Sequence, residues 1–88
     1  MLQIRRLVLD VLKPHQPEVL EFARAIAAQI EGSCVKLKVL EMDDKTETLE
    51  LIIEGQNLEL DTVVSAINEM GGSLHSVDGV EVMNVKEE

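Results

Sequence analysis

The densest group of residues that could do chemistry is the acidic segment EMDDKTE at residues 41–47. Its four carboxylates and its threonine hydroxyl are hard oxygen donors of the kind that bind Ca²⁺ or Mg²⁺. The segment lacks the glycine and the ligand spacing of an EF-hand loop. It also suits a solvated β-turn, in which aspartate is common. We favour the turn for a single chain, whereas an assembly that pairs two such segments would favour a metal site on Asp43, Asp44 and Glu47.

Three more candidate residues, Asp10, His15 and His75, lie outside this segment. Asp10 is flanked by valine and leucine, and its carboxylate is costly to bury unless it is paired with Arg6 or His75. A structural ion pair is favoured there over a ligand or catalytic role. Two histidines and an aspartate could also form a facial set for a transition metal, although the spacing leaves their mutual distances open. The simpler interpretations are a histidine at a helix start and a hydrogen-bonded histidine in a strand.

The sequence contains none of the usual arrangements for catalysis. It has no glycine-rich phosphate loop, no serine or cysteine nucleophile motif, no CxxC and no HExxH. Cys34 is the only cysteine, so it cannot form an internal disulfide and is interpreted as a small strand residue. The one enzymatic hypothesis left is a general base at His15 or His75 that Asp10 orients. We therefore expect that the protein is not an enzyme.

Composition limits the partners of the chain. The 88 residues carry 17 acidic and 8 basic side chains, a net charge of −9. That field repels phosphates, so we expect no nucleic acid and no membrane as partners, but cations or basic protein surfaces. No apolar run approaches the roughly 20 residues of a membrane span, and the start lacks a signal peptide, which predicts a cytoplasmic protein. A chain this small also gains burial by associating with other copies.

The spacing of apolar residues predicts the elements that must position these side chains. Residues 4–12 are dense in Val, Leu and Ile without helical spacing, which predicts a central strand with Leu7, Leu9 and Val11 facing the core. After two prolines, residues 17–31 predict a helix. Its predicted apolar stripe comprises Val19, Leu20, Ala23, Ile26, Ala27 and Ile30.

The rest of the chain predicts a hairpin, a second helix and a last strand. Apolar and polar residues alternate over 35–39 and 49–54, which predicts the two strands of the hairpin. The second helix would begin after an N-cap at Asp61. Its inward residues would be Val63, Val64, Ile67 and Met70. The last strand, over residues 74–85, is interrupted at Asp78-Gly79, where we expect a bulge.

The element order is therefore β-α-β-β-α-β, which with right-handed crossovers predicts the α+β class and a ferredoxin-like βαββαβ sandwich. Its four-stranded antiparallel sheet would have the order 4-1-3-2, with both helices on one face. Residues 1–85 would form a single domain, and the tail at 86–88 would fray. In this topology the acidic hairpin meets Asp10, His15 and His75 at one edge of the sheet.

Three stretches of the sequence stand out together: IRRLVLDVLKPH at residues 4–15, the pieces EMD, TE and IEG between residues 41 and 55, and GGSLHSVD at residues 71–78. The combination of LDVLKPH with HSVD resembles the archaeal domain-of-unknown-function family 211, over nearly the whole chain. The resemblance implies an archaeal ferredoxin-like domain that assembles into closed homo-oligomers, as rings, and it implies no established activity. The signature positions of the family map onto Asp10, Lys13, Pro14, His15, Asp43, Thr46, Glu47, His75, Ser76 and Asp78.

We therefore expect an uncharacterised, non-enzymatic and oligomeric binding module that holds a divalent cation, Ca²⁺ or Mg²⁺, or a small polar ligand at the sheet edge. The candidate metal ligands are Asp43, Asp44, Glu47, Asp10, His15 and His75. The alternative is a purely structural or regulatory domain for protein–protein interaction that forms a homo-oligomeric ring. In that case the open face of the sheet would mediate assembly.

Overall fold

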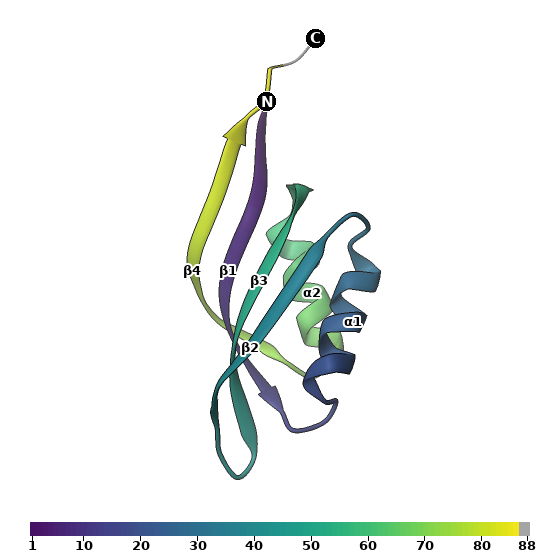
Figure 1. Ribbon diagram of the computed structural model, residues 1–88, viewed down its shortest axis with the longest axis vertical. Helices are drawn as coiled ribbons and strands as arrows, with labels where there is room; N and C mark the ends of the chain where they lie inside the picture. The colour runs from purple at the N-terminus through teal and green to yellow at the C-terminus, as the bar shows by residue number, and fades with distance from the viewer. Residues whose placement is uncertain (87–88) are drawn as a thin grey trace.

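A computed structural model of the chain describes residues 1–86. The elements are β1 (Leu2–Pro14), α1 (Val19–Gln29), β2 (Cys34–Met42), β3 (Thr46–Leu58), α2 (Leu60–Glu69) and β4 (Ser73–Asn84). The four strands form one antiparallel sheet in the order β2-β3-β1-β4, which is the predicted order 4-1-3-2 counted from the other edge. Both helices lie on the same side of this sheet (Figure 1). The predicted βαββαβ fold is confirmed, while residues 87–88 of the expected frayed tail lie outside the described residues.

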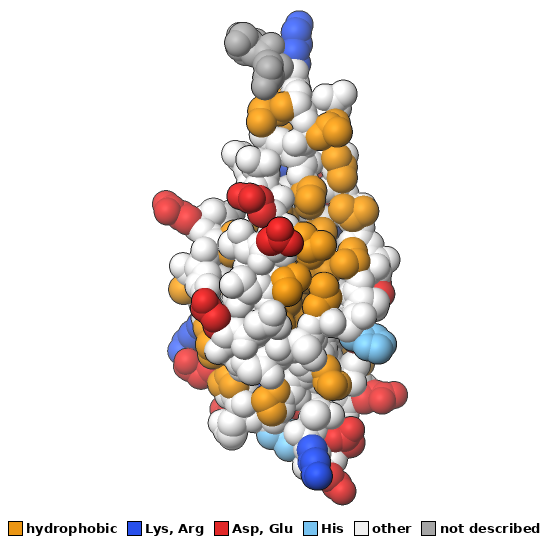
Figure 2. All heavy atoms as spheres, turned by 180° about the vertical axis from the view of Figure 1, so that it is seen from behind, with side chains coloured by type: hydrophobic (Ala, Val, Ile, Leu, Met, Phe, Trp, Pro, Cys, Tyr) orange, Lys and Arg blue, Asp and Glu red, His pale blue; other side chains and the backbone are white. Residues whose placement is uncertain are grey.

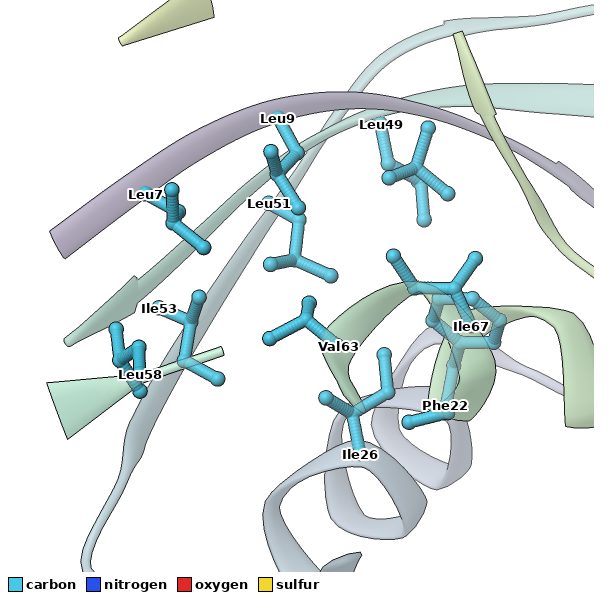
Figure 3. Close-up of a cluster of buried hydrophobic side chains, with 12 residues drawn as sticks. Leu7, Leu9, Phe22, Ile26, Leu49, Leu51, Ile53, Leu58, Val63 and Ile67 are labelled. Atoms are coloured by element: carbon cyan, nitrogen blue, oxygen red, sulfur yellow. The ribbon is translucent and has the colours of Figure 1, made fainter. Parts of the chain in front are cut away.

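The core forms where the two central strands meet the helices. Alternate residues of β1 point to the helix side, so that Leu7, Leu9 and Val11 are at most 2% exposed, as predicted. Their partners across the pairing with β3 are Ile53, Leu51 and Leu49, which are fully buried. Figure 3 shows these side chains pointing toward residues of α1 and α2. The alternate residues that face the other way form an open face, which no element covers among residues 1–86.

Helix α1 packs against the core with most of the predicted stripe, but with Phe22 in place of Leu20. It begins at Val19, and its buried residues are Phe22 and Ile26, four positions apart on one face. Leu20 was predicted to face the core but is 60% exposed, so this part of the stripe is wrong. Phe22, the only aromatic residue, is fully buried, and its burial sets which face of the helix points inward. Gly72 leaves the space for that ring, because a Cβ there would lie 2.9 Å from Phe22 Cζ.

Helix α2 begins earlier than predicted. Glu59 occupies the cap position, and Asp61 lies in the first turn, so the predicted N-cap at Asp61 is wrong. Asp61 still favours this end of the helix, because its charge faces the positive end of the helix dipole. The helix ends at Glu69 and is followed by Gly71, whose φ of +85° suits glycine; the next amide, of Gly72, donates to the carbonyl of Ile67. Neither helix within residues 1–86 is long and apolar enough to cross a membrane.

Strand β4 carries two bulges. Val8 pairs with Gly79 and Leu9 with Val77, so Asp78 is an extra residue, as predicted. A second register shift, which the sequence did not reveal, makes His75 extra between Ser76 and Leu74. Beyond the helices, β1 and β4 continue together as a two-stranded arm (Figure 1). The arm gives the molecule its elongated shape, with principal extents of 52 × 23 × 17 Å.

The orientation of α1 can be tested with two alanine variants. Ile26→Ala should lower the free energy of unfolding by about 2–5 kcal/mol, because it leaves a cavity in the core. Leu20→Ala should change it by less than about 0.5 kcal/mol, because this side chain is mostly exposed. Urea unfolding at a fixed protein concentration, followed by circular dichroism, measures both values. Equal losses for the two variants would contradict the observed orientation of the helix.

Candidate functional site

The sheet divides the predicted polar cluster into two groups on opposite faces. Glu47 and Lys13 are paired positions on β3 and β1 and both point to the helix side. His15 and Asp43 join them at the hairpin end of the sheet. Asp10 and His75 instead line a hollow on the open face. The sequence correctly places these residues at one end, but the backbone alternation separates them.

Lys13 is the centre of the first group. It continues the inward series of β1 beyond Val11 and is fully buried. Its ammonium Nζ donates to the carbonyl oxygens of Pro14 at 2.8 Å and Pro17 at 2.6 Å, and it lies 3.1 Å from Glu47 Oε1. A buried charge is tolerated only when its partners replace water. Lys13 therefore fastens the loop before α1 to both central strands.

The His15 side chain extends the Lys13 group toward the hairpin. Its Nδ1 lies 3.0 Å from Glu47 Oε2, and its Nε2 lies 2.8 Å from the carbonyl oxygen of Asp43. Both partners are acceptors, which suits a ring that donates from both nitrogens. The hydrogen bond that His15 donates to Glu47 raises the pKa of His15 above 6.5, and the same bond lowers the pKa of Glu47 below 4.5. The pair is therefore a charged one over the pH range between these values.

The acidic hairpin is a turn held by one of its own aspartates. Asp43 Oδ1 accepts hydrogen bonds from the backbone amides of Lys45, at 2.9 Å, and Thr46, at 2.8 Å. The Thr46 hydroxyl donates to the same carboxylate. These hydrogen bonds lower the pKa of Asp43, and the bond from the Thr46 amide has the largest effect. The contacts are those of the favoured turn interpretation, with Asp44 exposed at the tip.

The six predicted metal ligands do not come together in the single chain. Within residues 1–86, no three or more His, Cys, Asp or Glu side chains are placed to hold a metal ion. Both nitrogens of His15 already have protein partners, and so has the carboxylate of Asp43. A metal site on these residues would thus need carboxylates from a second chain.

The second group surrounds a hollow of about 230 Å³ on the open face. Its lining residues are Asp10, Leu12, Thr48 and His75. The bulge in β4 brings His75 to this position, which is a common use of a bulge. Asp10 Oδ1 is buried and has no hydrogen-bond partner in the described part of the chain. The predicted pairing of Asp10 with Arg6 is not formed, because Arg6 Nε approaches Glu54 instead, at 3.9 Å.

Sequence reasoning missed two features of these sites. The burial of Lys13 was not foreseen, although the alternation Leu7, Leu9, Val11 reaches it two residues later. Thr48 was not singled out either, and its place beside Asp10 follows only from the register between β1 and β3. The first signal was available in the sequence, and the second was not.

The sequence was then compared with known proteins. The model of the DUF211 family, described as uncharacterized ArCR, matches residues 5–86, almost the entire chain. The chain belongs to this archaeal family. One relative, "Uncharacterized protein MJ0319" of Methanocaldococcus jannaschii, is 40% identical over 77 residues, which cover 88% of this chain and 79% of that protein. The resemblance in the sequence is thereby confirmed. It assigns no activity to this DUF211 chain, since the family and the relative are both described as uncharacterized.

The importance of the buried lysine can be measured with Lys13→Met. This variant removes the bonds to Pro14 and Pro17 and leaves Glu47 without its ammonium, so we expect a loss of about 3–5 kcal/mol in the free energy of unfolding. The matched control is Lys36→Met, which breaks an exposed pair with Glu54 and should cost less than about 1 kcal/mol. Urea unfolding measures both variants. A similar small loss for each would show that Lys13 does not hold the loop.

The His15–Glu47 pair predicts a dependence of stability on pH. Because the pKa of Glu47 is lowered, its contribution is present above pH 4.5 and is lost as the pH falls through the lowered value. Because the pKa of His15 is raised, its contribution is complete below pH 6.5 and is lost as the pH rises through the raised value. The stabilising effect of the pair should therefore be greatest between these two pH values.

Urea unfolding of the wild type and of His15→Gln, at a series of pH values from acid to alkaline, tests this dependence. The stability difference between the two proteins should be largest in that window and should shrink on both sides. A difference that stays constant across the series would contradict the charged pair.

Proposed function

We propose that this DUF211 chain is a non-enzymatic binding module that assembles with copies of itself through its two edge strands, head to tail, into a closed homo-oligomer. The assembled hairpin ends would hold a divalent cation or a small polar ligand. One observation carries the proposal: each edge strand exposes apolar side chains on the helix side of the sheet, where the helices of the same chain do not cover them.

The first exposed strip lies on the edge strand β4. Val77, Val80 and Val82 pair with Leu9, Leu7 and Ile4 of β1 and therefore share their helix-side face. Unlike the buried Leu7 and Leu9, the three valines are 46%, 59% and 52% exposed. In Figure 2, hydrophobic side chains run along the molecule from the arm to its middle. A strip of this kind beside an unpaired strand edge favours association.

The second strip lies on the opposite edge strand, β2. Val39 and Met42 pair with Leu49 and Glu47 of β3, so they too face the helix side. They are 37% and 63% exposed. The two edges of the sheet therefore carry apolar side chains on the same face, and joining the β2 edge of one chain to the β4 edge of the next would bury both strips in one layer.

The strand directions and the charges support this pairing. Neighbouring strands alternate in direction across the sheet, so β2 and β4 run in opposite directions and would meet as an antiparallel pair between two equally oriented chains. Strand β2 exposes Lys36 and Lys38, and β4 exposes Asp78 and Glu81, which are opposite charges on the two edges. Such a heterologous contact forms a ring when its rotation closes. The net charge of −9 makes a cation at the junction favourable.

Two edge variants and their mixture test the assembly. Val80→Glu blocks the β4 edge and Met42→Glu blocks the β2 edge, and each should convert the oligomer into a monomer in native mass spectrometry. An equimolar mixture should then form one-to-one dimers, because each variant keeps the edge that the other lacks. The matched control is Leu20→Glu, an exposed apolar position on α1, which should leave the oligomer intact.

Several outcomes would contradict the proposal. A monomeric wild type rules out assembly, and an oligomer that only one of the two variants disrupts indicates contact between identical edges. Spectra recorded with Ca²⁺, with Mg²⁺ and with a chelator test the cation at the hairpin ends. Absence of bound metal at millimolar concentrations would contradict the cation and leave only the small polar ligand at the hairpin ends.

A further inference from the structure

We infer that the hollow on the open face is a binding site for a short alkylammonium ion, with the Asp10 carboxylate as its anchor. The hollow lies within one chain, on the face of the sheet opposite the edge strips, so this inference does not rest on the proposed assembly. It also differs from the hairpin end, where the carboxylates of Asp43 and Glu47 already have partners.

The first argument is the state of the Asp10 carboxylate. Its Oδ1 atom is buried, yet no group among residues 1–86 donates a hydrogen bond to it. The side chain nearest in register, Ser76, instead donates its hydroxyl to Asp78 Oδ1 at 2.7 Å. A buried acceptor without a donor is costly, and more so when it carries a charge. A ligand that brings an N–H donor would remove this cost.

The second argument is the charge around the hollow. Asp10 stands directly opposite Glu50 in the pairing of β1 with β3, and like charges at such positions repel. Glu50 has Lys38 as its neighbour on β2, whereas Asp10 has only Glu50 and Ser76 on its two sides. In the described residues, the ion pairs involve Glu21, Glu47 and Glu54, and none involves Asp10. The missing partner of Asp10 is therefore a cation.

The third argument is the size and lining of the hollow. Leu12 contributes an apolar wall that is 40% exposed, and Thr48 and His75 add a hydroxyl and an imidazole. The volume of about 230 Å³ is below the roughly 300–1,000 Å³ of sites for drug-sized ligands, so the ligand is small. An apolar wall beside one carboxylate suits an ion with a short alkyl chain and a charged end.

A metal ion fits this hollow less well. Ca²⁺ takes about six to eight oxygen ligands, and Mg²⁺ demands a nearly octahedral set. No cluster of three or more His, Cys, Asp or Glu side chains suited to a metal exists within residues 1–86. An ammonium group needs only acceptors for its N–H bonds, which the Asp10 carboxylate and the Thr48 hydroxyl supply.

Calorimetric titration with n-butylammonium tests the site directly. We expect saturable binding with one ion per chain, and at least a tenfold loss of affinity in Asp10→Asn. The matched control is Glu54→Gln, which removes the same charge from the open face away from the hollow and should keep most of the affinity. Uncharged n-butanol, which has a similar chain, should not bind. Equal affinity of the wild type and Asp10→Asn, or equal binding of n-butanol, would overturn the inference.

Two further measurements keep this test separate from the others. Without ligand, Asp10→Asn should be at least as stable as the wild type, because the carboxylate has no internal donor; a clear destabilisation would show that Asp10 serves the fold instead. Binding should persist in the monomeric Val80→Glu variant, which distinguishes failure of this site from failure of the assembly. Displacement of n-butylammonium by Mg²⁺ at lower concentration than the amine would overturn the inference in favour of a metal.

Discussion

The buried ammonium of Lys13 is the constraint on which the hairpin end of the molecule depends. It lies inside the sandwich, with the carbonyls of Pro14 and Pro17 and the carboxylate of Glu47 around it. Because none of these partners can move away without exposing a charge to an apolar core, they fix the end of β1, the loop and the start of β3 together. The ring of Phe22 lies 5.9 Å from the ammonium, within the range of a cation–π contact.

Four of the residues that carry the resemblance to the family belong to one contact network around Lys13. Lys13, His15, Glu47 and Asp43 are linked in one chain of contacts from the loop to the hairpin tip. Each partner restricts the next, so a change at one position affects the others. Asp10 and His75 stand apart from this network, on the other face of the sheet. Selection on the fold and selection on a ligand would therefore act on different residues of the same end.

Much of the fold could be predicted because β1 and β3 alternate so regularly that Leu7, Leu9, Leu49 and Leu51 could face only one core. The face of α1 could be predicted only in part, since its several alanines permit more than one apolar stripe and the burial of Phe22 decides among them. The sequence indicated which polar residues lie at this end of the sheet, but not which of them share a face. Whether Asp10 meets His15 or His75 depends on strand faces and on a bulge, and these follow from tertiary packing rather than from spacing along the chain.

The two bulges change the spacing of the β4 residues that face the helices. Between Leu74 and Val80 its helix-side residues, Leu74, Val77 and Val80, are three apart rather than two. An ordinary strand can slide by two residues and keep the same side chains inward, and an edge strand is the one most exposed to such slippage. A strand with this three-residue phase has no second alignment that keeps all three inward. The bulges therefore fix the register of β4 on β1, and any neighbouring strand that joins this edge has to pair in the register that β1 has already set.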